Sequence, residues 1–262
     1  MLAQLKHQFR ELERTQSAPM VSAGARYLWY QGKNLRDLVH MGAVRRALEA
    51  RDFPADAEGQ VAFVMDRFHG TIMPYQNRWE VARLAERVRA LGPKTVLEIG
   101  TARGGTLFLL CQAAAEDATI VSLDLPEGRN GGGFPNWKLP TYKAFARPGQ
   151  TLRFVRGNSH DPASRDEVHR LMERRGIDFI MIDGDHSYEG VKTDFELYYP
   201  LLAPGGLLAM HDIRPTPHDP SIDVHRFWLE VKERFETEEI VEVPDQPNFG
   251  IGLVHGPAPS AG

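Results

Sequence analysis

From Thr95 onward, the chain alternates short apolar runs with longer amphipathic segments. The apolar runs are rich in β-branched or aromatic residues and are bounded by Gly or Asp, a pattern that predicts strands buried on both faces. These runs are Thr95–Ile99, Thr119–Leu123, Leu152–Val155, Phe179–Ile182 and Leu207–Met210. The segments with helical apolar spacing between them are Thr106–Ala115, Asp166–Arg174 and Tyr188–Leu202. Strands that alternate with helices form right-handed βαβ units, so the sequence predicts an α/β fold with a parallel sheet.

The end of the chain departs from this alternation. Ile222–Phe235 has the spacing of one more helix, and two apolar runs follow at Ile240–Val243 and Phe249–Val254. Two strands joined by so short a turn pair antiparallel. We therefore expect a three-layer αβα, Rossmann-like architecture with a seven-stranded, mostly parallel sheet and a C-terminal antiparallel hairpin. Residues 256–262 contain only Gly, Pro, Ala and Ser and are predicted to form a disordered tail.

The first 76 residues look helical but less regular. Leu35–Leu48 has amphipathic spacing with Asn34 as its N-cap, and Asn77–Leu91 predicts a helix that stops at Gly92. We interpret residues 1–76 as a helical extension that covers the ligand edge of the sheet or forms an oligomer contact. A simple helical cap with no ligand role remains the alternative. The main domain would then span residues 77–255.

The charge and composition exclude several classes of protein. The 31 basic and 35 acidic side chains give a net charge of -4, which argues against a dedicated nucleic-acid binder or a basic membrane-surface protein. The single cysteine, Cys111, excludes a disulfide framework and a Cys-rich metal site. The sequence contains no run near the roughly 18 apolar residues of a membrane helix, and its N-terminus lacks a signal-peptide pattern. We expect a cytoplasmic enzyme.

A glycine-rich turn, Glu98–Thr106, follows the first predicted strand. Ligands of open parallel sheets bind beyond the carboxyl ends of the strands, and glycines let the backbone approach a ligand closely. The spacing is G-x-x-x-G-G, which differs from the G-x-G-x-x-G of dinucleotide sites. A carboxylate inside the strand, Glu98, suits a ligand with a cationic amino group. A plain glycine-containing turn is the alternative.

Polar residues also end the second and third predicted strands. Asp124 is placed where a carboxylate accepts hydrogen bonds from ribose hydroxyls. Asn158 and Ser159 are placed to reach the edge of an adenine ring. Each of these residues is also a common turn former. Together with the glycine-rich turn they indicate an adenosine-containing cofactor.

Five polar residues follow the fourth and fifth predicted strands. Asp183, Asp185 and His186 come after the fourth, and His211 and Asp212 come after the fifth. We expect them to converge at one edge of the sheet, where clustered carboxylates bind Mg²⁺ or another hard divalent ion. In the alternative interpretation, each acid caps the helix or loop that follows it.

Taken together, these motifs resemble those of the class I S-adenosylmethionine-dependent methyltransferases. The Gly-Thr-Ala-Arg-Gly-Gly-Thr turn and the Ile-Asp-Gly-Asp-His motif are similar to those of small bacterial O-methyltransferases acting on antibiotic sugars and related natural products. That group includes the macrocin and mycinamicin types and the cephalosporin hydroxylase-like proteins. The resemblance covers about Pro74 to Val254 and implies S-adenosylmethionine as the cofactor, together with a divalent metal for which Mg²⁺ is the first candidate.

The resemblance also implies roles for individual residues. Those implied in cofactor binding are Gln76, Glu98, Gly100, Thr101, Gly104, Asp124, Asn158, Ser159 and Asp183. Asp183, His211 and Asp212 match the positions that hold Mg²⁺ in metal-dependent relatives. His211 departs from the acid that is usual there, and an imidazole favours Mn²⁺, Fe²⁺ or Zn²⁺ more than an all-oxygen site does.

The chemistry of methyl transfer to a hydroxyl requires a base. His186, with an ordinary pKa of about 6.5, suits that role at neutral pH, and Asp185 is the competing candidate. The expected acceptor is a small-molecule hydroxyl, on a sugar or a glycosylated natural product, and Pro126–Lys143 with Phe134 and Trp137 is placed to cover it. We expect a homodimer.

Two other functions are compatible with parts of this pattern. An NAD(P)-dependent oxidoreductase shares the fold and the ribose-binding acid, but the spacing of the turn and the acids after the fourth strand disfavour it. A non-catalytic S-adenosylmethionine-binding protein would retain the turn, yet it has no need for Asp183, Asp185, His186 and Asp212.

Overall fold

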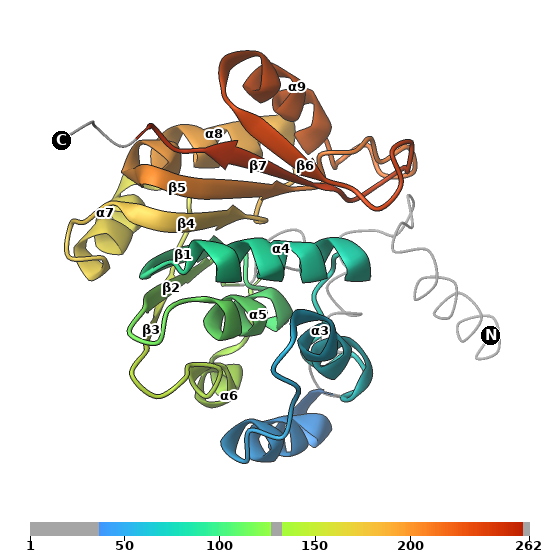
Figure 1. The fold of residues 1–262 in the computed structure, drawn as a ribbon, viewed down its shortest axis with the longest axis vertical. Helices are drawn as coiled ribbons and strands as arrows, with labels where there is room; N and C mark the ends of the chain where they lie inside the picture. The colour runs from blue at the N-terminus through green and yellow to red at the C-terminus, as the bar shows by residue number, and fades with distance from the viewer. Residues whose placement is uncertain (1–36, 127–132, 259–262) are drawn as a thin grey trace.

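The computed structural model describes residues 37–126 and 133–258, which build one sheet between two layers of helices (Figure 1). The sheet has seven strands in the order β3-β2-β1-β4-β5-β7-β6. The strands are β1 (Thr95–Ile99), β2 (Thr119–Asp124), β3 (Thr151–Arg156), β4 (Ile177–Ile182), β5 (Leu202–His211), β6 (Thr237–Ile240) and β7 (Ile251–His255). The predicted α/β fold and its seven-stranded sheet are confirmed.

The five strands from β3 to β5 are parallel, and their register brings the polar residues to one edge. Ile99 at the end of β1 lies opposite Leu123 of β2 and Ile182 of β4. Asp124 and Asp183 therefore emerge at the same height, one residue beyond the level of Ile99, and Glu98 lies one residue before it, opposite Ser122 and Met181. The strand order reverses between β1 and β4, which is where ligands bind in open α/β sheets.

The helices divide between the two faces of the sheet. They are α3 (Ala57–Asp66), α4 (Arg78–Leu91), α5 (Gly105–Ala113) and α6 (Leu139–Lys143) on one face, and α7 (Pro162–Leu171), α8 (Tyr188–Tyr198) and α9 (Val224–Arg234) on the other. Two short 3₁₀ turns are η1 (Asn136–Lys138) and η2 (Tyr199–Leu201). Alternate residues of each strand serve the two faces: Val96 packs with the first group and Leu97 with the second.

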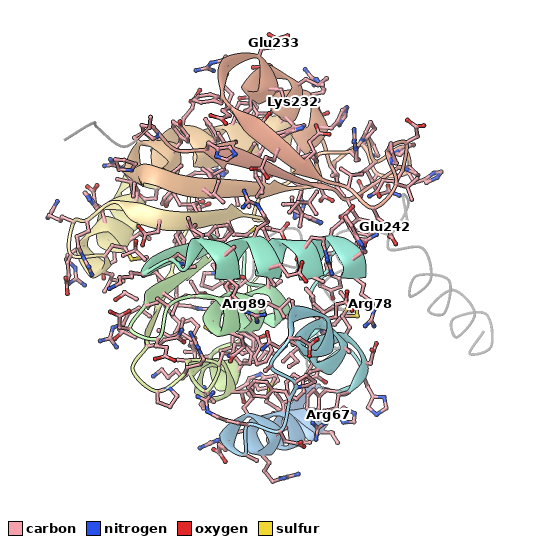
Figure 2. The ribbon with its side chains drawn as sticks, viewed as in Figure 1. Arg67, Arg78, Arg89, Lys232, Glu233 and Glu242 are labelled. Atoms are coloured by element: carbon pink, nitrogen blue, oxygen red, sulfur yellow. The ribbon has the colours of Figure 1, made fainter. Side chains whose placement is uncertain are left out.

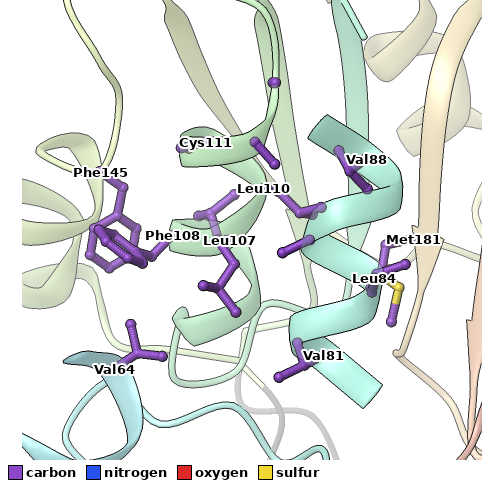
Figure 3. Close-up of a cluster of buried hydrophobic side chains, with 14 of the residues drawn as sticks. Val64, Val81, Leu84, Val88, Leu107, Phe108, Leu110, Cys111, Phe145 and Met181 are labelled. Carbon is purple, nitrogen blue, oxygen red and sulfur yellow. The ribbon is translucent and has the colours of Figure 1, made fainter. Parts of the chain in front are cut away.

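Figure 3 shows how α4 and α5 cover the first face. Val81, Leu84 and Val88 of α4 lie beside Leu107 and Leu110 of α5, and all are buried. The predicted ends of α4 are also observed. Asn77 Oδ1 accepts from the amides of Trp79 and Glu80 at 2.8 and 3.3 Å, and Gly92 ends the helix in the left-handed conformation with φ of 60°.

Several predicted boundaries were wrong for local reasons. Helix α7 begins at Pro162, four residues earlier than predicted, because Asp161 caps it and proline is favourable in the first helical turn. Helix α8 ends at Tyr198, because Pro200 falls in η2 before β5 begins at Leu202.

The C-terminal hairpin forms, but its first strand is displaced. β6 covers Thr237–Ile240 and pairs antiparallel with β7, which pairs antiparallel with β5. The apolar pattern did not identify β6 because two of its residues, Glu238 and Glu239, are charged. Charged residues are common on edge strands. Just after β7, the amide of Gly256 donates to the carbonyl of Gly206, and the carbonyl of Pro257 accepts from the amide of Gly205. Residues 259–262 lie outside the described residues.

The N-terminal part shares a core with the rest of the domain. A helix covers residues 37–49, and its Val44 packs in the same cluster as Val61 of α3 and Phe108 of α5. The predicted cap Asn34 and Leu35 lie outside the described residues. Among the described residues, none of the helices has the length and apolar character needed to span a membrane.

Candidate active site

The buried carboxylates of Glu98 and Asp124 flank the turn after β1. Glu98 Oε2 accepts from Thr101 Oγ1 at 2.5 Å, and Asp124 Oδ2 accepts from the amides of Thr101 and Ala102 at 2.8 and 2.9 Å. Burial raises the pKa of both carboxyls. The second oxygen of each, Glu98 Oε1 and Asp124 Oδ1, is buried without a partner in the protein. Such unpartnered oxygens suit a ligand that brings its own N–H and O–H donors.

The glycines of this turn are required by protein packing. Gly100 has φ of +89°, and a Cβ there would lie 2.0 Å from the carbonyl oxygen of Asp183. Gly104 has φ of +82°, and a Cβ there would lie 2.9 Å from the ring of Tyr142. The space left by the missing side chains is therefore taken by the protein itself, whereas the sequence had suggested that glycines let the backbone of the turn approach a ligand closely. Thr101 Oγ1 is likewise engaged, by Glu98 and by Ser122 Oγ at 2.6 Å.

Three buried charged side chains form an ion triad that holds Arg103 of the same turn. Asp37 is paired with Arg103 at 2.5 Å and with Lys138 at 2.7 Å, and all three side chains are nearly inaccessible to solvent. Arg103 Nε also donates to the carbonyl of Gly70 at 2.6 Å. The triad joins helix 37–49 and η1 to the turn. Sequence reasoning missed it, because its members are 66 and 101 residues apart along the chain and each looks like an ordinary surface charge.

Two carboxylates and two imidazoles form a cluster at the carboxyl ends of β4 and β5, where His211 is the last residue of β5. Asp183, His186, His211 and Asp212 each offer one ligand atom, and these atoms lie within 4.8 Å of one another. His211 Nδ1 is 3.1 Å from Asp183 Oδ1 and 3.4 Å from Asp212 Oδ1. His186 Nδ1 is 2.6 Å from Asp212 Oδ2. The convergence expected from the sequence is thus observed for four of the five residues.

The electrostatics of this cluster are strongly coupled. Burial by itself would lower the pKa of His211, but the charges of Asp212 and Asp183 outweigh it and raise that pKa to about 9. Burial would raise the pKa of Asp212, yet His211 and His186 lower it to about 2. The carboxylates therefore create a site that holds positive charge, and mixed imidazole and carboxylate donors are suitable ligands for a divalent ion.

Gln76 links the cluster to the turn region. Its Nε2 donates to Asp183 Oδ2 at 2.9 Å, and its Oε1 accepts from Thr106 Oγ1 at 3.2 Å, at the start of α5. The side chain is buried. Gln76 thus lies between the start of α5 and Asp183.

Known proteins match the part of the chain that carries this site. A family model described as a methyltransferase domain matches residues 97–213, from β1 to the residue after the cluster. The chain is 27% identical to the rhamnosyl O-methyltransferase of Mycobacterium bovis over an aligned segment of 140 residues. This segment covers 51% of each of the two chains. Residues 97–213 thus form a methyltransferase domain of the class I S-adenosylmethionine-dependent type. The matches cover from 16% to 55% of the lengths of the first curated relatives.

Solved structures of methyltransferases share this fold. An O-methyltransferase from Bacillus cereus, solved in complex with SAH, superimposes with a TM-score of 0.51 at 16% identity, covering 83% of this chain and 90% of that one. The MycE methyltransferase of the mycinamycin biosynthetic pathway, solved with Mg, SAH and mycinamycin VI, gives a TM-score of 0.51 at 17% identity, covering 78% and 56%. At these identities the likeness concerns the fold alone.

Within this methyltransferase domain, Asp185 is turned away from the cluster. Its Oδ1 accepts from the amide of Ser187 at 2.9 Å, and a Cβ at Gly190 would lie 2.2 Å from its carboxyl carbon. Asp185 therefore caps the turn that starts α8, as the alternative interpretation of these acids proposed for each of them. Asn158 is exposed, and Ser159 is half-buried with its carbonyl accepting from Tyr198.

The connection after β2 contributes one exposed and one buried aromatic ring. Trp137 is exposed, but Phe134 is buried, with the guanidinium of Arg156 4.1 Å from its centroid and the ring of Tyr142 at 4.7 Å. Phe134 is therefore a core residue and does not face an acceptor. Residues 127–132, which include most of the glycine-rich stretch, lie outside the described residues.

Glu80 is a functional candidate that sequence reasoning missed. This buried carboxylate of α4 accepts from Gln246 Nε2 at 2.6 Å and from the amide of Gly250 at 2.9 Å, and burial raises its pKa. It thereby holds the loop whose Phe249 ring lies 5.9 Å from the ring of His211. In the sequence, Glu80 reads as an ordinary acid in the first turn of a helix.

Proposed function

We propose that the protein is an S-adenosylmethionine-dependent O-methyltransferase that acts on a hydroxyl of a sugar or sugar-bearing small molecule. The observation that carries this proposal is the arrangement at one edge of the sheet. The unpartnered oxygens of Glu98 and Asp124 lie at the ends of β1 and β2, and the cluster of Asp183, His186, His211 and Asp212 lies at the ends of β4 and β5. A methyl donor and a hydroxyl acceptor need two such neighbouring sites.

The cofactor is assigned to the first of these sites. Glu98 Oε1 would accept from the amino group of S-adenosylmethionine, and Asp124 Oδ1 would accept from a ribose hydroxyl. Gly100, Thr101 and Gly104 shape the turn between them, Asn158 and Ser159 border the adenine position, and Gln76 with Asp183 closes the methionine end. Each of the two unpartnered oxygens gains the hydrogen bond that it lacks in the free protein, which favours binding.

A divalent metal is assigned to Asp183, His211 and Asp212. The donor set supports this assignment, because the carboxylates hold His211 as a cation in the free protein, so the site accommodates positive charge. A bound divalent ion would lower the pKa of an acceptor hydroxyl. The imidazole of His211 makes Mn²⁺, Fe²⁺ or Zn²⁺ better matched than an all-oxygen site would.

His186 is proposed as the general base. Asp212 Oδ2 accepts from His186 Nδ1, which leaves Nε2 as the proton acceptor and fixes the plane of the ring. In the transfer, the acceptor oxygen bonds to the methyl carbon, the carbon–sulfur bond breaks, and the hydroxyl proton passes to Nε2. The products are the methyl ether and S-adenosylhomocysteine. The side chain is 27% exposed, so the proton can leave to solvent.

The class of acceptor is supported by the relatives. The rhamnosyl O-methyltransferase of Mycobacterium bovis acts on a rhamnosyl group, as its name states, and MycE was solved with mycinamycin VI. A sugar hydroxyl is a weak acid, which explains why a base and a metal site would be combined in one cluster.

Methyl transfer from labelled S-adenosylmethionine to a panel of glycosides and phenols tests this proposal. We expect transfer to rhamnosides that is abolished by EDTA and restored by Mn²⁺. Calorimetric titration with S-adenosylmethionine and with NAD⁺ and NADP⁺ provides the control, and only the first should bind. Binding of a dinucleotide in its place would favour the oxidoreductase, and cofactor binding without transfer to any acceptor would favour a non-catalytic protein.

A further inference from the structure

A surface cavity at the N-terminal end of α4 is separate from the cluster. Its volume is about 490 Å³, within the range of about 300–1,000 Å³ that is common for small-molecule sites. Its walls come from α3, from the start of α4 and from the loop after β6, and we call it the Trp79 cavity. The side chains used below are Glu58, Asn77, Arg78, Trp79, Arg83 and Glu242. Figure 2 shows Arg78 and Glu242 at the same end of α4.

Trp79 gives this cavity an apolar surface. The indole is 41% exposed, whereas most large apolar side chains of the domain are buried. The guanidinium of Arg83 lies 5.7 Å from the ring centroid. An exposed indole within a cavity offers a flat apolar face to a ligand ring, with polar groups beside it. The C–H face of a sugar ring is complementary to such a surface.

The charges around Trp79 favour an uncharged ligand. The two cations Arg78 and Arg83 are balanced by the two anions Glu58 and Glu242. Arg83 pairs with Glu58 at 2.7 Å, and Asn77 Nδ2 donates to Glu242 at 2.8 Å. Exposed pairs of this kind contribute only about 0–1 kcal/mol, so they can exchange partners with ligand hydroxyls at small cost. A neutral polyol therefore matches the cavity better than a phosphate or an amine does.

Two chain segments lead from the walls of the cavity to the cluster. Asn77 in its wall follows Gln76, which donates to Asp183 at 2.9 Å. Glu242 belongs to the loop that also carries Phe249, whose ring centroid is 5.9 Å from that of His211. An acceptor with its reacting hydroxyl at the cluster would extend toward the N-terminal end of α4 and place its next ring against Trp79.

We propose that the Trp79 cavity is an acceptor subsite that binds the neutral sugar ring next to the one that is methylated. This inference rests on the proposed function, because it takes the acceptor to be a glycoside. It adds that the enzyme prefers an acceptor of at least two rings. Trp79 supplies the stacking surface, and Asn77, Arg83 and Glu242 supply hydrogen bonds to ring hydroxyls.

The variant Trp79→Ala tests the subsite, with Leu229→Ala as the matched control. Leu229 is another exposed apolar residue, 55% exposed, on α9 and outside the lining of the cavity. The acceptors are methyl α-L-rhamnopyranoside and the methyl glycoside of a rhamnose disaccharide. We expect Trp79→Ala to lower the ratio of kcat/KM for disaccharide over monosaccharide by about tenfold, with unchanged affinity for S-adenosylmethionine and unchanged Tm. An unchanged ratio, or the same fall in Leu229→Ala, would overturn the proposal.

A binding measurement separates failure of the subsite from failure of the proposed function. Saturation-transfer NMR with the disaccharide needs no cofactor, metal or turnover. If neither sugar is methylated, the proposed function fails, and a saturation signal in the wild type that Trp79→Ala loses would still support the subsite. Absence of that signal in the wild type, or its persistence in Trp79→Ala, overturns the subsite whatever the outcome of the transfer assay.

Discussion

The two halves of the site are built in different ways. The turn after β1 is shaped by backbone and packing: the backbone of Asp183 lies against Gly100, the ring of Tyr142 lies against Gly104, and Arg103 is held by Asp37. The cluster after β4 and β5 is shaped by charge, with carboxylates and imidazoles in mutual contact. The first half is therefore sensitive to volume and backbone conformation, and the second is sensitive to proton and metal binding.

The largest expected effect is on chemistry at the cluster. We expect His186→Ala to lower turnover by about 10² to 10⁴-fold, equivalent to roughly 3–5 kcal/mol, with the affinity for S-adenosylmethionine unchanged. Single-turnover kinetics and calorimetric titration measure the two quantities. Asp185→Asn is the matched control and should retain most of the activity, because Asp185 faces the start of α8. Loss of activity in Asp185→Asn alone would assign the base to Asp185.

A substitution at Gly100 tests whether a change in the turn after β1 also displaces Asp183 of the cluster. In Gly100→Ala, the new Cβ would meet the carbonyl oxygen of Asp183, and the residue would keep a positive φ. We expect a loss of about 4 kcal/mol in the free energy of unfolding, measured by urea denaturation, with weaker binding of both cofactor and metal. Gly92→Ala is the control, since it has a φ of +60° and open space around it. It should lose only about 1 kcal/mol.

Asp37→Asn loosens the turn and leaves the cluster intact. The substitution leaves Arg103 and Lys138 buried without a counter-charge, which should cost about 3 kcal/mol of stability and weaken cofactor binding. Mn²⁺ binding, followed by electron paramagnetic resonance, should stay at the wild-type level. Glu49→Gln removes the exposed pair with Arg45 and should change stability by less than about 0.5 kcal/mol. Equal losses in both variants would show that the triad has no special role.

The smallest effect concerns a buried acid outside both halves. Asp194 of α8 is fully buried, and burial raises its pKa to about 6. Because its pKa is raised on folding, ionisation of Asp194 destabilises the protein as pH rises from about 4 to 6. Asp194→Asn should match the wild type near pH 4 and be about 1–2 kcal/mol more stable above pH 6, measured by denaturation across that range. A constant difference at all pH values would contradict this account.

Local sequence patterns predicted much of the fold and the location of the site. Apolar runs identified every strand of the parallel sheet, because a strand buried on both faces needs apolar side chains throughout. β6 was misplaced, because an edge strand tolerates Glu238 and Glu239. Polar residues at strand ends identified the cluster and the carboxylates Glu98 and Asp124. Asp185 was indistinguishable from its neighbours, since spacing does not tell which way a side chain turns.

The sequence by itself determined which residues reach the carboxyl edge of the sheet, because that depends on strand length and on the residue at which each strand ends. Only the tertiary structure decided what each residue does there. Gln76 meets Asp183 across 107 residues, and Arg103 meets Asp37 across 66. Such contacts depend on how separate segments pack, and packing selects side-chain directions that no local pattern encodes. The same packing decided that the glycines of the turn accommodate protein, and that Glu98 and Asp124 each keep one oxygen without a protein partner.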